Sequence, residues 1–297
     1  MAAWILHLVS EACPLGFAHE LNGTIHRFIP KAPSFKGVSR LLNELPFSRE
    51  IWESIIERFP VRRSLSMQIR RAITSSSCTL HSANAGTDVF WTHTTVVKTL
   101  EGPIWPPSFA VSACHSKEND LTLGIVLGLD YKWMTRAHRI LETILDDGHD
   151  MTNSHHLLMP RLSAELQIAR LAHVSSLIRT RTVQWDASLR DYLLRKEYPR
   201  THFVQKVLND ITVCGFLQNE SRATKRLLKL AHRHAESFLP EWEKETAITR
   251  STHDETSDRF LRRYEEMQLE TKKLTDDSQL SVKGLSDQLD RVSCRPD

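Results

Sequence analysis

The densest group of side chains that could do chemistry in this sequence lies between residues 146 and 156. It consists of carboxylates and imidazoles: Asp146, Asp147, His149, Asp150, His155 and His156. Such donors can bind a divalent cation and activate a water molecule, which raises the hypothesis of a metal-dependent hydrolase. The spacing does not match a calcium-binding EF-hand, because a loop starting at Asp146 would have Gly148 in its third position rather than its sixth. We interpret the segment as a polar loop between helices and leave the question of a metal open.

A nucleophile beside a general base would be the other common arrangement for catalysis. Cys114 and His115 are the only adjacent thiol and imidazole in the sequence. Neighbours on a strand point to opposite faces of the sheet, so we expect no contact between these two groups. We interpret His173, His232 and His234 as partly buried or surface side chains of helices.

Sequence motifs for phosphate cradles, dinucleotide binding, nucleophile elbows and zinc proteases are all missing. We therefore assign no catalytic residue and no cofactor.

Two sets of basic residues are candidates for binding an anionic partner. They are Arg58, Arg62, Arg63, Arg70 and Arg71, and then Arg222, Lys225, Arg226, Lys229 and Arg233. The second set recurs at helical spacing, so it predicts one cationic stripe that could meet phosphates, an anionic lipid surface or an acidic helix. A charged stripe on an amphipathic helix is usually its solvated face. Aromatic residues do not alternate with it, so the stripe gives no specific nucleic-acid signal, while peripheral contact with a membrane stays open.

The composition is that of an ordinary globular protein. A net charge of +3 over 297 residues gives no overall attraction to nucleic acid. The five cysteines are odd in number and form no CxxC pair, so we interpret them as reduced thiols. The apolar stretch at 121–129 is far shorter than the about 20 residues that span a membrane, and the N-terminus lacks the basic start of a signal peptide. We expect a cytoplasmic protein without a transmembrane segment.

The sequence of residues 1–132 predicts a small mixed α/β region. The apolar N-terminus suits a buried strand, and residues 38–59 have the spacing of a small helical pair. Residues 75–86 are small and polar, which favours a loop. β-Branched and aromatic residues predict a small antiparallel sheet with strands at 88–100, 109–115 and 121–129, the last two forming a hairpin.

Residues 133–297 predict a helical region. One helix should end near Gly148, and another should begin near Pro160 and run toward Pro199. Two more are expected at 201–218 and 220–238, separated near Gly215.

The last segment alternates steps of four and three between apolar or small residues. These are Phe260, Tyr264, Met267, Thr271, Leu274, Ser278, Ser281, Leu285, Gln288 and Val292. The spacing predicts a long amphipathic, coiled-coil-like C-terminal helix. Its seam could pack against another helix of the chain or against a second copy, and the pattern does not decide between them.

Two parts of the sequence resemble a large group of uncharacterised filamentous-fungal proteins. The first is ILETILDD at 140–147 with SHHLLMPRLSAELQIARL at 154–171, and the second is RRYEEMQLETKKLTDD at 262–277 with VKGLSDQL at 282–289. In that group a small β-containing region precedes long helices, and some longer members are similar to the soluble region of CorA-type magnesium transporters. This chain has no Gly-Met-Asn motif and no spanning helix, so the resemblance does not imply transport.

The sequence thus predicts an α+β protein, predominantly α, with a small antiparallel sheet followed by an elongated helical region. We expect a non-enzymatic helical interaction or scaffold protein that binds a protein partner or itself through its C-terminal helix. One alternative is a truncated cytosolic domain related to CorA-like membrane proteins, which would bind a divalent cation or a longer relative. The second alternative is the metal-dependent hydrolase.

Overall fold

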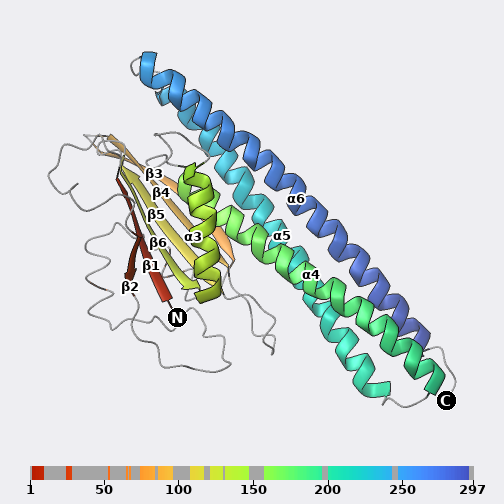
Figure 1. The fold of residues 1–297 in the computed structure, drawn as a ribbon. Coiled ribbons are helices and arrows are strands. Elements are labelled where there is room, and N and C mark those ends of the chain that lie inside the picture. The colour runs from red at the N-terminus through yellow and green to blue at the C-terminus, as the bar shows by residue number, and fades with distance from the viewer. Residues whose placement is uncertain are drawn as a thin grey trace. The chain divides into compact units, whose positions relative to one another are not determined.

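Strands come first in the chain and long helices follow (Figure 1). The structure is a computed structural model that describes residues 2–9, 25–28, 53, 65, 67, 74–83, 86–95, 108–116, 121–129, 131–146, 157–195, 200–242 and 247–293. The strands are β1 (Ala2–Val9), β2 (Ile25–Phe28), β3 (Ser75–Ala83), β4 (Gly86–Thr95), β5 (Phe109–Ser116) and β6 (Leu121–Leu129). The helices are α3 (Tyr131–Asp146), α4 (Leu158–Arg195), α5 (Arg200–Trp242) and α6 (Ala247–Ser293). The predicted fold class is confirmed.

The strands form one antiparallel sheet in the order β2-β1-β6-β5-β4-β3. β5 and β6 pair as the predicted hairpin, with Val111 opposite Val126. The N-terminal segment is a strand, as expected, and pairs with β6. The side chains of the central strands are buried on both faces, since Val111 and Ala113 point to one face and Ala110 and Ser112 to the other.

The prediction of a loop at residues 75–86 was wrong, because β3 occupies Ser75–Ala83. The serines of β3 bond across to polar side chains of β4. Ser76 Oγ lies 2.8 Å from His93 Nδ1, and the hydroxyl groups of Ser77 and Thr92 also bond. Backbone pairing with β4 and these cross-strand bonds stabilise a strand whose residues have weak intrinsic strand preference.

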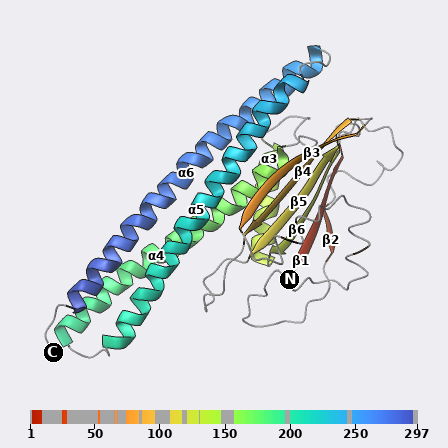
Figure 2. The same ribbon diagram turned by 180° about the vertical axis from the view of Figure 1, so that it is seen from behind.

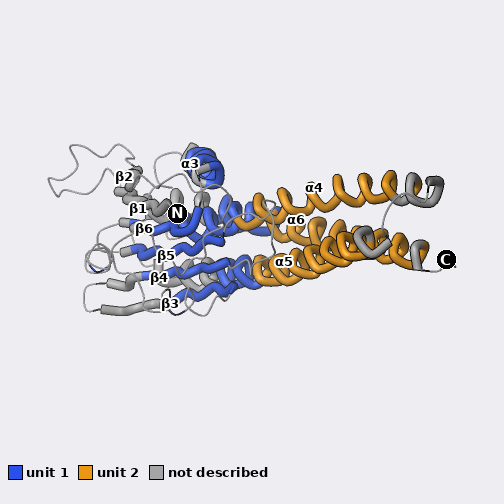
Figure 3. The backbone as a smooth tube through the Cα atoms, turned by 90° about the horizontal axis from the view of Figure 1, so that it is seen from below, with its two compact units in different colours: residues 1–166, 226–266 blue, residues 167–225, 267–297 orange. Residues whose placement is uncertain are grey.

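The chain divides into two compact units (Figure 3). Unit 1 is residues 1–166 and 226–266, and unit 2 is residues 167–225 and 267–297. The boundary near residue 132 was drawn between the strand-rich and helical parts of the chain, and it stays a prediction.

In unit 1 the helices lie on one side of the sheet (Figures 1 and 2). α3 buries Trp133, Leu141 and Ile144, which belong to its predicted apolar face. The first turns of α4 contact β6, where Met159 lies directly over Gly124. Pro160 is in the first turn of α4, as the sequence predicted, because proline lacks the N–H that this turn leaves without a helical partner.

Unit 2 consists of segments of α4, α5 and α6 that run side by side (Figure 3). Arg170 of α4 pairs with Glu220 of α5, and Arg181 pairs with Asp210, so residue numbers rise on one helix as they fall on the other. Arg179 of α4 pairs with Asp277 of α6, and Asp186 accepts a hydrogen bond from Gln288. α5 is therefore antiparallel to α4, whereas α6 is parallel to α4.

The prediction of two helices at 201–218 and 220–238 was wrong, because α5 is continuous from Arg200 to Trp242. Gly215 lies inside the helix. Glycine in a helix interior costs about 1 kcal/mol relative to alanine. Burial of the neighbouring Val213, Cys214 and Leu217 offsets a cost of this size. The predicted helical pair at 38–59 lies outside the described residues, apart from Glu53.

Candidate functional site

The seam predicted for the C-terminal helix is buried inside the chain. In unit 1 it buries Phe260 and Tyr264. In unit 2 it buries Met267, Thr271, Ser278, Leu285 and Gln288. Leu274 and Ser281 are half-buried, and the side chain of Val292 lies outside the described part of the structure. This face of α6 is therefore used for packing within each unit.

Polar contacts fix the rotation of α6 about its own axis in unit 2. Ser278 Oγ donates a hydrogen bond of 3.1 Å to the backbone carbonyl of Cys214 on α5. Gln288 Nε2 donates to Asp186 on α4, and Arg179 Nη2 donates to Asp277 Oδ2 at 2.7 Å. Because the seam is held on two sides, the opposite face of α6 points away from α4 and α5.

That opposite face carries two leucines in an otherwise charged surface. We call it the outer face of α6 and define it as Leu269, Lys273, Asp276, Leu280, Lys283 and Asp287, all exposed. Leu269 and Leu280 are each 69% exposed. They are eleven residues apart, close to three helical turns, so they lie on the same side of the helix. Single exposed apolar residues are common on protein surfaces, but two on one line form a stripe that a partner helix can cover.

A buried polar cluster joins α4 to α5 in unit 2. Gln167 Nε2 donates to Glu220 Oε2 at 2.7 Å, and Arg170 Nη1 donates to Gln167 Oε1 at 3.2 Å. Arg170 Nη1 also lies 3.6 Å from Glu220 Oε2. Burial lowers the pKa of the Arg170 guanidinium to about 10, and the negative charge of Glu220 opposes this effect. A cluster of this kind fixes how the two helices align.

A second cluster lies around Asp210, a buried carboxylate on α5. It accepts hydrogen bonds from Arg181 Nη1 at 2.8 Å and from Trp185 Nε1 at 2.6 Å. The ammonium group of Lys206 lies 5.5 Å from the centre of the Trp185 ring. All of these groups have structural roles, because they satisfy one another and join α4 to α5.

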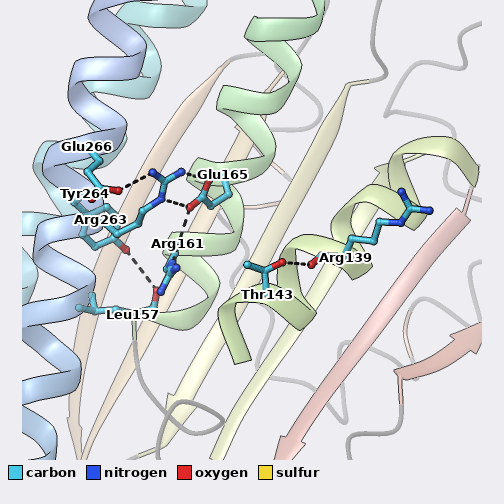
Figure 4. A network of polar contacts seen from close by, with 8 residues as sticks. All are labelled: Arg139, Thr143, Leu157, Arg161, Glu165, Arg263, Tyr264 and Glu266. Atoms are coloured by element: carbon cyan, nitrogen blue, oxygen red, sulfur yellow. Dashed lines mark hydrogen bonds and ion pairs between the residues drawn. The ribbon is translucent and has the colours of Figure 1, made fainter. Parts of the chain in front are cut away.

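In unit 1 a polar network ties the start of α4 to α6 (Figure 4). Arg263 binds Glu165 through two hydrogen bonds, Nε to Oε1 at 2.6 Å and Nη2 to Oε2 at 2.8 Å. The guanidinium carbon of Arg161 lies 5.2 Å from the centre of the Phe260 ring. Burial raises the pKa of the Tyr264 phenol well above its usual range, so this hydroxyl stays protonated. The network holds two helix segments together.

Neither Cys78 nor Cys214 has an activated thiol. Burial raises the pKa of Cys78 to about 12. It also raises the pKa of Cys214 to about 11, where nearby Asp210 adds to the shift and Ser278 opposes it. A nucleophilic cysteine requires the opposite shift. His115 bonds through Nδ1 to Thr122 Oγ1 at 2.9 Å, which is its partner on β6, while Cys114 alternates to the other face of the sheet.

The predicted cationic stripe lies on α5. Arg222, Arg226, Lys229 and Arg233 are exposed, and Lys225 is half-buried. Arg222 and Lys225 belong to unit 2, whereas the other three belong to unit 1. Arg222 donates to Asn219 Oδ1 at 3.2 Å. A role of these residues in binding an anionic partner stays a prediction.

The other candidates fall largely outside the described residues. This holds for Arg58, Arg62, Arg63, Arg70 and Arg71, and for the group at 146–156 except the backbone of Asp146. His173 and His232 are half-buried helix residues, as expected. Among the residues that the structure does describe, no three His, Cys, Asp or Glu side chains come together in a way that could hold a metal ion.

Comparison with known proteins does not identify a family for this chain. No protein-family model and no curated protein matches this sequence. The resemblance to the filamentous-fungal group therefore stays a prediction. None of the helices in the described ranges combines the length and the apolar composition needed to cross a membrane.

Reasoning from the sequence did not single out the exposed Leu269 and Leu280. The signal that could have found them is their eleven-residue spacing on the face opposite the seam. Without the structure, the seam itself was the stronger candidate for binding a partner, because its apolar and small residues recur at steps of four and three along the helix.

Proposed function

We propose that this chain is a non-enzymatic helical interaction protein that binds a partner protein through the outer face of α6. The observation that carries the proposal is the pair Leu269 and Leu280, which are exposed on one line while the seam of the same helix is buried. A helix with one buried face and a second apolar stripe can pack against its own chain and against another helix at the same time.

The energetics favour a weak and reversible interaction. Full burial of a leucine is worth about 1.5–3 kcal/mol, so covering these two largely exposed side chains would contribute roughly 2–4 kcal/mol. The loss of translational and rotational freedom on association costs about 4–15 kcal/mol. The leucines alone are therefore not sufficient, and the charged residues between them must contribute. Interactions among exposed charges are screened by salt, so binding should weaken as ionic strength rises.

The rigidity of unit 2 supports this role. Ser278, Asp277 and Gln288 hold α6 in one rotation about its axis. The clusters around Glu220 and Asp210 align α4 with α5. A surface that is ordered before binding loses less conformational entropy when a partner docks. The two alternative functions, a cation-binding relative of CorA-like proteins and a metal-dependent hydrolase, stay predictions.

A site-specific photocrosslinker tests the proposal. We would introduce a photoreactive amino acid at position 280, or at the exposed Gln205 on α5 as the matched control, and irradiate the protein in a lysate of its source cells. The proposal expects one defined adduct, identified by mass spectrometry, from position 280 but not from position 205. That adduct should be lost when Leu269→Lys is added. Equal labelling from both positions, or no defined adduct from position 280, would contradict the proposal.

A further inference from the structure

The outer face of α6 has a symmetry that suggests its partner. Leu269 and Leu280 are equally far from the midpoint between Leu274 and Thr275. Lys273 and Asp276 are also equally far from it. These four residues belong to unit 2. Each leucine is thus matched by the other leucine, and Lys273 is matched by Asp276.

Two antiparallel helices related by a two-fold axis bring such matched residues face to face. With the axis at this midpoint, Leu269 of one copy would lie against Leu280 of the second copy. Lys273 would lie against Asp276 of the second copy, and both contacts would occur twice. A parallel pair would instead bring Lys273 against Lys273 and Asp276 against Asp276, which is repulsive.

Opposite charges also match about the same midpoint beyond this segment. Four further pairs of exposed residues are equally far from the midpoint and opposite in charge: Glu266 with Lys283, Arg262 with Asp287, Arg259 with Asp290, and Asp258 with Arg291. On a helix face that contacts only water, nothing requires residues equally far from a midpoint to have opposite charges. Complementarity of this kind is how charged positions of coiled coils select partner and orientation.

We infer that the partner of the outer face is a second copy of this chain, bound antiparallel with the two-fold axis between Leu274 and Thr275. This inference rests on the proposed function and names its partner. The interface is narrow and mostly charged, so the dimer is weak, sensitive to salt and dependent on protein concentration.

A crosslinking experiment tests the register. We would place Leu269→Cys in a chain with one affinity tag and Leu280→Cys in a chain with another, mix them, and treat them with a short bis-maleimide. The antiparallel pairing expects crosslinks between the two differently tagged chains, well above those formed by either variant alone or by the wild type, which carries the native cysteines. Stronger crosslinking of each variant with itself would indicate a parallel pairing and would overturn the inference.

A charge exchange tests the contact between Lys273 and Asp276. Lys273→Asp would bring two carboxylates together on each side of the two-fold axis, and we expect the dissociation constant to rise on the order of tenfold. Adding Asp276→Lys to the same chain restores opposite charges in the antiparallel register and should restore affinity. Both residues are exposed, so the melting temperature should stay close to that of the wild type. A double variant that binds no better than the single variant would contradict the proposed register.

Two measurements together distinguish a failure of this inference from a failure of the proposed function: the oligomeric state of the purified chain and the adduct formed at position 280. If the purified chain stays monomeric in concentrated solution while the photocrosslinker at position 280 captures a different protein, the second copy is the wrong partner and the proposed function stands. If the purified chain is monomeric and position 280 captures nothing, both are overturned.

Discussion

Arg170 of α4 and Glu220 of α5 form an ion pair in which both side chains are almost completely buried. Their exposed fractions are 3% and 5%, and Nη1 lies 3.6 Å from Oε2. Gln167 bonds to both residues. A buried pair of this kind is not a strong net source of stability, because both charges lose their hydration. Burying one of these charges without the other is costly. The pair therefore favours a single alignment of α4 and α5.

The first prediction concerns this pair. Arg170→Met leaves Glu220 as a buried, uncompensated charge, so we expect a loss of about 3–5 kcal/mol in the free energy of unfolding. Combining Arg170→Met with Glu220→Leu should recover most of the loss. Urea denaturation of the single and double variants would measure both values. Arg179→Met is the matched control: Arg179 is also paired with a carboxylate on a neighbouring helix, that of Asp277, but is 67% exposed, so the cost should be below about 1 kcal/mol.

The second prediction concerns two glycines of β6 that have different roles. A Cβ atom at Gly124 would lie 2.5 Å from Cε and 3.0 Å from Sδ of the buried Met159. Gly124→Ala should therefore destabilise the fold by about 1–3 kcal/mol through overpacking. In a Met159→Ala background the same change should cost far less, because the space is then open.

Gly128 serves as the contrast, since its φ of 92° is a backbone conformation that favours glycine. Gly128→Ala should cost about 1–2 kcal/mol in either background, as shortening Met159 does not relieve backbone strain. Thermal unfolding of the four combinations would distinguish packing from strain. Equal relief of both alanine variants by Met159→Ala would contradict the assignment.

The third prediction concerns alkaline pH. Burial raises the pKa of Cys214 from 9.0 to about 11, so the folded protein retains this proton in a range where the unfolded chain loses it. The stability that comes from Cys214 is fully present below pH 9 and is lost as the pH rises toward 11. The total loss is roughly 2–3 kcal/mol.

Cys214→Ala should make the fall in unfolding free energy between pH 9 and pH 10 shallower, before the tyrosines of the unfolded chain ionise. Cys78, whose pKa burial raises to about 12, contributes to the fall that is left. Urea denaturation at closely spaced pH values would measure the slopes. If wild type and variant have equal slopes over this range, Cys214 does not titrate as the structure indicates.

The parts of the fold that the sequence predicted are those with strong local patterns. The polar residues 116–120 between two apolar strands predicted the β5–β6 hairpin, and the spacing from Phe260 to Gln288 predicted the buried face of α6. β3 was missed because its serines pair with β4 through hydrogen bonds that depend on a distant segment. The continuity of α5 was missed because burial around Gly215 outweighs the local weakness of glycine.

The candidate site could be predicted only in part. The seam of α6 was found, but whether it would pack inside the chain or against a second copy depends on how α4 and α5 fold back onto it. Once that packing is known, the exposed leucines on the other face stand out. The charge symmetry about the midpoint between Leu274 and Thr275 is present in the sequence, although it has meaning only when the exposed face is known.

The last prediction is that self-association depends on Leu269 and Leu280, and sedimentation velocity of the wild type and of a Leu269→Lys, Leu280→Lys double variant tests it most directly. The concentrations should run from the micromolar to the millimolar range, at low and at high salt. We expect the weight-average sedimentation coefficient of the wild type to rise toward that of a dimer at low salt and to rise less at high salt. The double variant should keep the wild-type melting temperature and stay monomeric. A wild type that is monomeric at every concentration, or a double variant that associates as strongly as the wild type, would contradict a dimer formed through the outer face of α6.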